Sequence, residues 1–358
     1  MVTLDDIATM VGVSRSTVSR VLNGRETAVE ISPVTRKRIL AAARELHYHP
    51  NLFARGLRWK RSSVIGVIIK DFTYPFWNGI IKGINERCAE RGYHVILSDA
   101  TEDDRGLDKA STLLGQLGVD GIILGGSHSV DRNAILRLLE RCRNVVGVAS
   151  RDVDPDLVPY FKVDDNLGMQ LLLEHLISLG HRRIGYIGLV RSGSFTLRYD
   201  AYKRILAEHG LPLSRGLVAQ IDMETHFPST DEFLELGAAM TRRVLASGEP
   251  IDALVAACDS LAVGALQAAH SAGLLVPRDL SVAGFDDAPL ARYCIPPLTT
   301  IRQPVLEMGR RAVSLLVGRI EGKIDSPRGT LHLPPEGLIV RASTAPLGEG
   351  RGVESRGV

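Results

Sequence analysis

The first 46 residues place apolar side chains at the spacing of short helices. The earliest apolar positions recur three or four residues apart, which gathers them on one helix face: Leu4, Ile7, Ala8 and Val11. Before them, Thr3-x-x-Asp6 is a capping-box pattern, in which two side chains satisfy free N–H groups at a helix start. We therefore predict a helix from Thr3 that ends at the turn Gly12-Val13.

Two further helices are predicted behind this turn. Ser14 is placed to cap a helix from Arg15 to Leu22, which the pair Asn23-Gly24 closes. A third helix begins at Ser32-Pro33, a cap followed by the residue best tolerated at the first helical position, and runs to about Leu46. Its expected apolar stripe is Val34, Ile39, Ala42, Ala43 and Leu46. Such a helix-turn-helix with a third helix can close a miniature core.

The second helix divides into an apolar and a polar face, as a helix that reads DNA must. Val18, Val21 and Leu22 can face inward. Arg15, Ser16 and Arg20 can face outward, and arginine matches guanine O6 and N7 with two parallel hydrogen bonds. The short donors suited to phosphate oxygens are Ser14, Thr17 and Ser19. A plain solvated helix face is the alternative interpretation.

From Ser63 onward, short apolar runs alternate with amphipathic stretches of helix length. This alternation predicts parallel sheets with crossover helices, and hence an α/β body. The runs are Val64–Ile69, His94–Ser98, Gly121–Leu124, Val145–Ala149, Ile184–Ile187, Leu254–Ala257 and Ser281–Gly284.

Charge is distributed unevenly between these two parts. Residues 1–61 carry 11 Lys/Arg against 5 Asp/Glu, a net of +6, and the remainder carries a net of −4. A basic head on a mildly acidic body fits a phosphate-binding module joined to a ligand-sensing module. The sequence contains no stretch of continuous apolar residues long enough to span a bilayer and no secretion leader, so we expect a cytoplasmic protein.

The four cysteines are far apart and fit neither a disulfide framework nor a metal-ligand spacing. We therefore expect no metal site and no cofactor. Enzyme motifs are also missing: no Gly-x-Gly-x-x-Gly follows a strand, and Gly125 to Ser129 does not have the order of a nucleophile elbow. The sequence therefore favours a binding protein over an enzyme.

Several phrases of the chain resemble the LacI/GalR family of bacterial transcription regulators. They include Val2-Thr3-Leu4-Asp5-Asp6-Ile7-Ala8, Thr17-Val18-Ser19-Arg20-Val21-Leu22-Asn23-Gly24, Tyr48-x-Pro50-Asn51, Gly118-Val119-Asp120-Gly121, Gly284-Phe285-Asp286-Asp287 and Pro297-Leu298-Thr299-Thr300-Ile301. Nearly the whole chain is covered. The resemblance implies a helix-turn-helix head and a periplasmic-binding-protein-like body, in which two parallel-sheet subdomains are joined by three crossovers. It also implies an allosteric regulator, here expected to be a repressor, that binds a near-palindromic DNA operator as a homodimer.

The family's short hinge helix, which folds on the operator, falls on residues 50–61. There Asn51 and Arg55 are expected to contact DNA, and Leu57 is expected to wedge into the minor groove. Gly56 departs from the serine common in the family, so we expect a hinge that is disordered off DNA. The predicted domains are 1–49 (helix-turn-helix), 50–61 (hinge), 62–345 (effector binding and dimerisation) and 346–358 (flexible tail). The expected DNA contacts are Thr3, Ser14, Arg15, Ser16, Thr17, Ser19, Arg20, Asn23, Asn51, Arg55 and Leu57.

Candidate effector-binding residues follow the predicted strands, because ligands of open α/β sheets bind beyond the carboxyl ends of the strands. The resemblance places an effector-contacting arginine at Arg198 and an acceptor carboxylate at Asp286. Facing each other across a cleft, these two could bind sugar hydroxyls from both sides. A structural salt bridge is the alternative. The full set is Asp71, Phe72, Phe76, Trp77, Ser127, Ser150, Arg151, Arg198, Met223, Cys258, Asp259, Asp286 and Gln303.

Two departures from the family pattern leave the ligand open. Cys258 stands where asparagine is common, and Met223 where an aromatic platform is common. The pair Phe76-Trp77 could stack a sugar or a base, or belong to the core. A sugar is the favoured effector, and the sequence does not decide whether it releases or recruits DNA. The alternatives are a solute-binding protein without a regulatory role and a fold-related sugar-metabolising enzyme.

Overall fold

The computed structural model describes residues 2–22, 31–48, 61–69, 72, 74–100, 103–126, 132–149, 154–190, 193–222, 229–324 and 329–348. The chain divides into two compact units, a head of residues 1–62 and a body of residues 63–358. Predicted features that lie outside the described residues are the hinge residues 50–60 and the end of the tail, 349–358. No helix among the described residues is long and apolar enough to cross a membrane.

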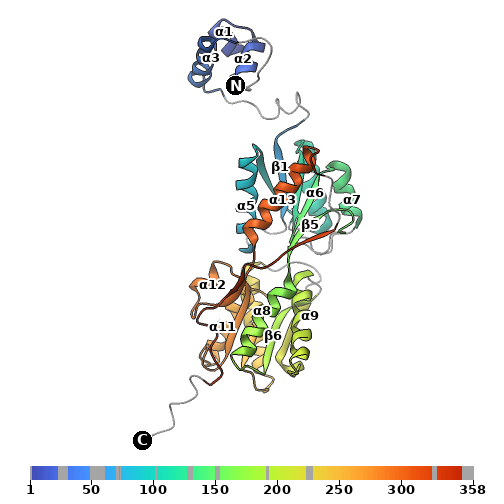
Figure 1. Cartoon of the computed structure of the whole chain (residues 1–358), viewed down its shortest axis with the longest axis vertical. Coiled ribbons are helices and arrows are strands. Elements are labelled where there is room, and N and C mark those ends of the chain that lie inside the picture. Colours follow the sequence, from blue (N-terminus) through green and yellow to red (C-terminus); the bar gives the residue numbers. More distant parts are fainter. Residues whose placement is uncertain are drawn as a thin grey trace. The chain divides into compact units, whose positions relative to one another are not determined.

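The head consists of the helices α1 (Leu4–Val11), α2 (Arg15–Leu22) and α3 (Pro33–Glu45), which appear in blue in Figure 1. The capping box forms as predicted: the Asp6 N–H donates to Thr3 Oγ1 at 3.4 Å, and the Thr3 N–H donates to Asp6 Oδ2 at 2.7 Å. Gly12 ends α1 in the left-handed conformation with φ 73°, which glycine adopts at little cost. The predicted helix-turn-helix is therefore confirmed in its elements.

The small core of the head consists of buried side chains from all three helices: Ile7, Ala8, Val11, Val18, Val21, Ile39, Ala42 and Ala43. A long polar side chain ties α3 to the end of α1, because Arg38 Nη2 donates to the Val11 carbonyl at 2.9 Å. One prediction is wrong: Val34 is 70% exposed, since it lies in the first turn of α3 on the side that faces water.

The body contains two six-stranded sheets, in agreement with the predicted α/β class. The first sheet is parallel throughout and has the order β11-β5-β4-β3-β1-β2. Its strands are β1 (Val64–Ile69), β2 (His94–Asp99), β3 (Gly121–Gly125), β4 (Val145–Val148), β5 (Tyr160–Val163) and β11 (Thr330–Leu333). Figure 1 shows α5 (Phe76–Glu90) and α13 (Val305–Ile320) on one face, and α6 (Asp103–Gln116) and α7 (Arg132–Arg141) on the other.

The second sheet has the order β12-β10-β9-β8-β6-β7, and its edge strand β12 runs antiparallel to β10. Its strands are β6 (Ile184–Val190), β7 (Val218–Asp222), β8 (Ala253–Ala256), β9 (Ser281–Asp286), β10 (Thr299–Arg302) and β12 (Gly337–Ile339). Its helices are α8 (Asp165–Ser178) and α9 (Gly193–Glu208) on one face, α10 (Thr230–Leu245) and α11 (Asp259–Ser271) on the other, and the short α12 (Leu290–Tyr293). A 3-10 turn, Arg215–Leu217, precedes β7.

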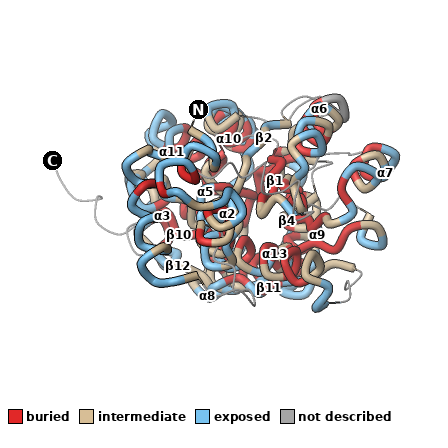
Figure 2. The backbone as a smooth tube through the Cα atoms, turned by 90° about the horizontal axis from the view of Figure 1, so that it is seen from above, coloured by how far each residue is buried: buried red, intermediate tan, exposed pale blue. Residues whose placement is uncertain are grey.

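We call these sheets with their helices the N-subdomain and the C-subdomain. The chain passes between them three times, after β5, after β10 and after β11, as the family resemblance implied. Strands β1, β3, β4, β8 and β9 are buried along their whole length because helices cover both faces, and Figure 2 shows buried backbone in red at β1 and β4. Leu347, in the predicted tail, donates its backbone N–H to the Leu179 carbonyl at 2.8 Å, so the tail is docked at its start.

Candidate functional site

The start of α2 carries a cluster of short hydroxyl side chains. Ser14 Oγ lies 2.8 Å from both Ser16 Oγ and Thr17 Oγ1, and it accepts the Thr17 backbone N–H at 3.2 Å. Ser14 therefore caps α2 as predicted. The arrangement leaves hydroxyl donors and the N-terminal end of a helix together, a combination that suits a phosphate oxygen.

The side chains of α2 divide between core and surface nearly as predicted. Arg15 and Ser16 are exposed, Arg20 is half-buried, and Val18 and Val21 are buried. Ser19 differs, because it is only 9% exposed. It lies beside the buried face of the helix, so its hydroxyl is withdrawn from the surface that could reach phosphate. The Thr3 hydroxyl is engaged in the capping box, where it donates to Asp6 Oδ2 at 2.8 Å.

The predicted DNA contacts Asn23, Asn51, Arg55 and Leu57 lie outside the described residues. The same holds for the predicted effector contacts Asp71, Ser127, Ser150, Arg151 and Met223.

In the body, a buried arginine lies at the centre of a cluster of carboxylates. Arg198 on α9 is 4% exposed, and its Nε donates to Asp165 Oδ1 at 2.8 Å. Its Nη1 donates to the Ala257 carbonyl at 2.5 Å and to Asp286 Oδ1 at 3.4 Å. Burial alone would lower the pKa of Arg198, but the charges of Asp165 and Asp286 more than offset this and raise it. The guanidinium is therefore charged inside the body.

Asp286 connects the two subdomains. It ends β9 of the C-subdomain, and its Oδ2 accepts the phenol of Tyr74, at the other side of the subdomain boundary, at 3.0 Å. Its Oδ1 also accepts Gln303 Nε2 at 2.5 Å. Burial raises the pKa of Asp286 to about 6, although Arg198, Gln303 and Tyr74 all stabilise its ionised form. Its backbone has φ 128°, a region that non-glycine residues rarely occupy, and such strain is concentrated at functional sites.

The geometry corrects the prediction that Arg198 and Asp286 face each other across a cleft. Both come from the C-subdomain, where Arg198 forms two ion pairs, one with Asp286 and one with Asp165. The polar group that reaches Asp286 from the N-subdomain is Tyr74. The salt-bridge alternative therefore holds for this conformation, while the cluster as a whole lies at the carboxyl ends of the strands, where a ligand site is expected.

The neighbouring acidic residues differ in their roles. Asp259 begins α11, where its Oδ1 accepts the Thr300 hydroxyl at 2.5 Å and its Oδ2 accepts the Ala288 N–H at 2.7 Å. Burial and the nearby charge of Asp286 raise the pKa of Asp259 to about 8, so it carries a proton at neutral pH. Asp287 instead binds the arginines Arg302 and Arg341 at 2.6 and 2.5 Å, which together with hydrogen bonding lower its pKa against the opposing effect of burial.

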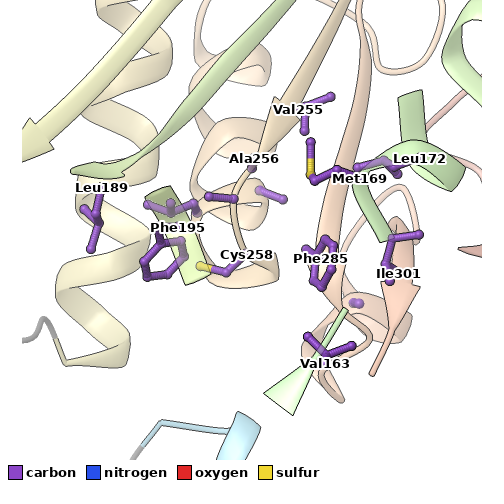
Figure 3. Close-up of a cluster of buried hydrophobic side chains, with 14 of the residues drawn as sticks. Val163, Met169, Leu172, Leu189, Phe195, Val255, Ala256, Cys258, Phe285 and Ile301 are labelled. Carbon is purple, nitrogen blue, oxygen red and sulfur yellow. The ribbon is translucent and has the colours of Figure 1, made fainter. Parts of the chain in front are cut away.

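Aromatic side chains surround this cluster. The Arg198 guanidinium lies 3.7 Å from the centre of the Phe285 ring, and Tyr74 packs against Phe233 with ring centres 5.3 Å apart. Figure 3 shows Phe195, Cys258 and Phe285 in one buried cluster. Cys258 is fully buried, and burial raises the pKa of its thiol to about 12, so it is an uncharged core thiol.

The predicted aromatic pair Phe76-Trp77 belongs mainly to the N-subdomain core. Trp77 is 5% exposed and covers the end of β3, where a Cβ at Gly126 would lie 2.5 Å from Trp77 Cζ2. Phe76 and Phe72 are half-buried and pack against the same core. Phe76 extends toward the site through Tyr74, with ring centres 6.2 Å apart. Trp77 packs on the end of β3 and is therefore part of the core.

Sequence reasoning missed Tyr74, Asp165, Phe195 and Phe233, which meet at this site. For two of them a signal was available: Tyr74 lies five residues after the end of β1, and Asp165 lies two residues after the end of β5. Asp165 is 2% exposed, and its Oδ2 has no hydrogen-bond partner among the described residues. This buried carboxylate oxygen can therefore accept a hydrogen bond from a ligand.

Comparisons with known proteins give a consistent result. Residues 3–51 match the family described as bacterial regulatory proteins, lacI family, and residues 173–344 match the periplasmic binding protein-like domain. The chain is 35% identical to the HTH-type transcriptional regulator DegA of Bacillus subtilis (strain 168) over 351 residues, 96% of this chain and 98% of the relative.

Solved structures extend this likeness to the fold. The lac repressor dimer bound to operator and the anti-inducer ONPF superposes with a TM-score of 0.82 at 29% identity, covering 96% of this chain and 99% of that one. A complex of the transcriptional regulator CelR with cellobiose superposes with a TM-score of 0.69 at 30% identity, covering 96% of this chain and 100% of that one.

Proposed function

The chain belongs to the lacI family of bacterial regulatory proteins. We propose that it is a transcription repressor whose affinity for a near-palindromic operator is controlled by a sugar. The likeness to DNA-binding regulators along nearly the whole chain makes it a DNA-binding transcription regulator. Beyond this, we assign the residues that read DNA, the chemical class of the effector, and the contact that couples effector binding to DNA binding.

Base reading is assigned to the polar face of α2, which holds the exposed Arg15 and Ser16 at its start and the half-buried Arg20 in its last turn. Arg15, Ser16 and Arg20 reach base edges, while Ser14 and Thr17 bind phosphate. Two heads of a homodimer would enter successive major grooves, about 10 base pairs apart. The dimer is supported by the lac repressor, whose solved structure is a dimer bound to operator. Sedimentation of the full chain tests this, and a monomer or a tetramer would contradict it.

The effector is assigned to the cluster around Arg198, and the observation that carries this assignment is the buried charge itself. Arg198, Asp165 and Asp286 are each at most 8% exposed, and burying three charged groups is costly unless they are paired and hydrogen-bonded. A polyol both donates and accepts hydrogen bonds, so its hydroxyls can accept from the guanidinium and donate to the carboxylates. Its C–H faces suit the rings of Phe195 and Phe233. The relative CelR in complex with cellobiose supports a sugar as the class of ligand.

The link to DNA is proposed to pass through the contact between Tyr74 and Asp286. A sugar hydroxyl that binds Asp286 Oδ2 competes with the Tyr74 phenol, which comes from the other subdomain. Effector binding then changes how the two subdomains meet. The operator and the sugar would favour different arrangements of the body, which is the thermodynamic condition for allosteric control.

The proposal is tested by selecting operators from random DNA with the full-length protein, alone and with a panel of sugars and nucleobases. We expect one near-palindromic sequence to be enriched and one sugar to change its affinity. Enrichment altered by a nucleobase and by no sugar would overturn the assigned effector class. No enrichment under any condition would overturn the function itself.

A further inference from the structure

An ion pair joins the first two helices of the head on its exposed side. Arg15 Nη1 lies 3.4 Å from Asp5 Oδ2, and the two side chains are 67% and 62% exposed. Arg15 is the first residue of α2, and Asp5 lies in the first turn of α1. The residue placed to meet a base edge is thus already paired with a carboxylate before DNA is bound.

Stability of the head does not account for this pair. Exposed ion pairs contribute little to stability because water screens them and two side chains lose freedom. The capping of α1 is carried by Asp6, whose carboxylate binds the Thr3 N–H at 2.7 Å. Asp5 takes part in the local hydrogen bonds of α1 through its backbone, because its carbonyl accepts the Thr9 hydroxyl at 2.9 Å. A favourable interaction with the helix dipole is the remaining structural role for its carboxylate.

At a DNA surface the pair has a different consequence. A free arginine can bind any phosphate, and such contacts raise affinity without regard to sequence. A carboxylate beside it cancels part of this attraction and is itself repelled by phosphates. Its charge, 3.4 Å from Arg15 Nη1, also restrains the guanidinium and orients its N–H donors toward the two acceptors of a guanine.

We propose that Asp5 is a specificity-determining residue, which holds Arg15 for one guanine in each half-site and lowers its affinity for phosphate. This inference rests on the proposed function, since it requires α2 to read bases. Asp5 is a positioning residue that acts through Arg15. Its carboxylate weakens binding to DNA of arbitrary sequence more than binding to the operator.

The test compares the full-length wild type with Asp5→Asn, Arg15→Ala, the double variant and Glu45→Gln. Glu45 is an exposed carboxylate at the end of α3, so its variant controls for the loss of one negative charge in the head. Each protein is titrated against the selected operator, operators with single base changes and a random duplex at several salt concentrations. Helix content and thermal melting are recorded alongside, to identify any variant that fails to fold.

For Asp5→Asn we expect affinity for the random duplex to rise several-fold and discrimination at one symmetric pair of guanines to fall about tenfold, within the range of a single base contact. Glu45→Gln should raise affinity for both duplexes and leave discrimination intact. In the Arg15→Ala background, Asp5→Asn should change discrimination no further.

Unchanged discrimination in Asp5→Asn would overturn the inference while the proposed function stands. So would equal loss of discrimination in Glu45→Gln, or a further loss in the double variant. If the wild type itself has no base preference, the proposed function fails and this inference fails with it.

Discussion

The head and the body each contain an arginine paired with a carboxylate, and the two pairs differ in their exposure to water. In the head, Arg15 and Asp5 are 67% and 62% exposed and lie 3.4 Å apart. In the body, the side chain of Arg198 is 5% exposed, that of Asp165 is fully buried, and they lie 2.8 Å apart. An exposed pair can exchange its partner for a base at little cost. A buried pair can exchange only for a ligand that supplies equivalent hydrogen bonds.

The largest effect should come from breaking the buried pair. Replacing Arg198→Ala leaves Asp165 and Asp286 buried without their cation, which should lower the free energy of unfolding of the body by about 3–5 kcal/mol. Urea unfolding of the full chain measures it. As a control, Arg311→Ala removes an exposed pair with Glu307 and should cost less than about 1 kcal/mol. Equal losses in the two variants would show that burial does not distinguish them.

Arg20, on the polar face of α2, should affect DNA binding and leave the stability of the body unchanged. Arg20→Ala should weaken operator binding by about 1–3 kcal/mol, because a base contact is lost. The body should keep its sugar affinity and its unfolding free energy. Binding to operator and to a random duplex is measured by fluorescence anisotropy, and sugar binding by calorimetry. Loss of sugar affinity together with operator affinity would point to misfolding and would contradict the assigned role.

The buried acids predict a dependence of body stability on pH. The folded-state pKa of Asp259, raised to about 8, lies far above its ordinary value of 3.8, so the folded body binds a proton that the unfolded chain has released. Its stabilising contribution is complete below that ordinary value and is lost as pH rises toward 8, by up to about 1.4 kcal/mol per pH unit. Asp286, with a pKa of about 6, contributes in the same direction at lower pH.

Unfolding between pH 6.5 and 7.5 separates this contribution from the others. Burial lowers the pKa values of His175 and His181, so their opposite effect falls at lower pH, and burial raises the pKa values of the cysteine thiols, so their effect falls at higher pH. Asp259→Asn imitates the protonated acid, since its amide can still accept from Ala288 and donate to Thr300. The variant should lose most of the slope. A wild-type stability that rises with pH across this range would contradict the prediction.

The smallest effect is expected at the contact between the subdomains. Tyr74→Phe removes one buried hydrogen bond to Asp286, worth about 1 kcal/mol, so separated subdomains should become roughly fivefold more populated without ligand. X-ray scattering should then give a larger radius of gyration. Tyr202→Phe is the matched control, because its phenol donates to the Ile184 carbonyl inside the C-subdomain at 2.7 Å. An equal radius for the two variants would exclude a bridging role for Tyr74.

The two regions also differ in how far the sequence predicts them. The helices of the head follow from local signals, since Thr3, Ser14 and Ser32 each cap the helix that they precede. The buried strand β1 was predicted with its observed ends, because a run of six apolar residues is bounded by polar ones. Strand β5 was missed because it has four residues interrupted by Lys162.

The site in the body depends on contacts that no local pattern encodes. Tyr74 and Asp286 are 212 positions apart, and their hydrogen bond exists only because two sheets end at the same boundary. The family resemblance predicted Arg198 and Asp286, but the interpretation that they face each other across a cleft was wrong, because both belong to the C-subdomain. In the head, local pattern was also insufficient at one position. Helical periodicity places Ser19 at the margin of the polar face, but the structure buries it.

In this account, α2 selects a DNA sequence and the buried cluster around Arg198 governs that selection. The most direct test is the ratio of the dissociation constants of the full chain for its selected operator and for a scrambled duplex, measured with and without each sugar of the panel. We predict a ratio of about 10³ or more, which one sugar changes in the wild type and leaves unchanged in Arg198→Ala. Equal affinity for the two duplexes, whatever metabolite is added, would contradict the claim.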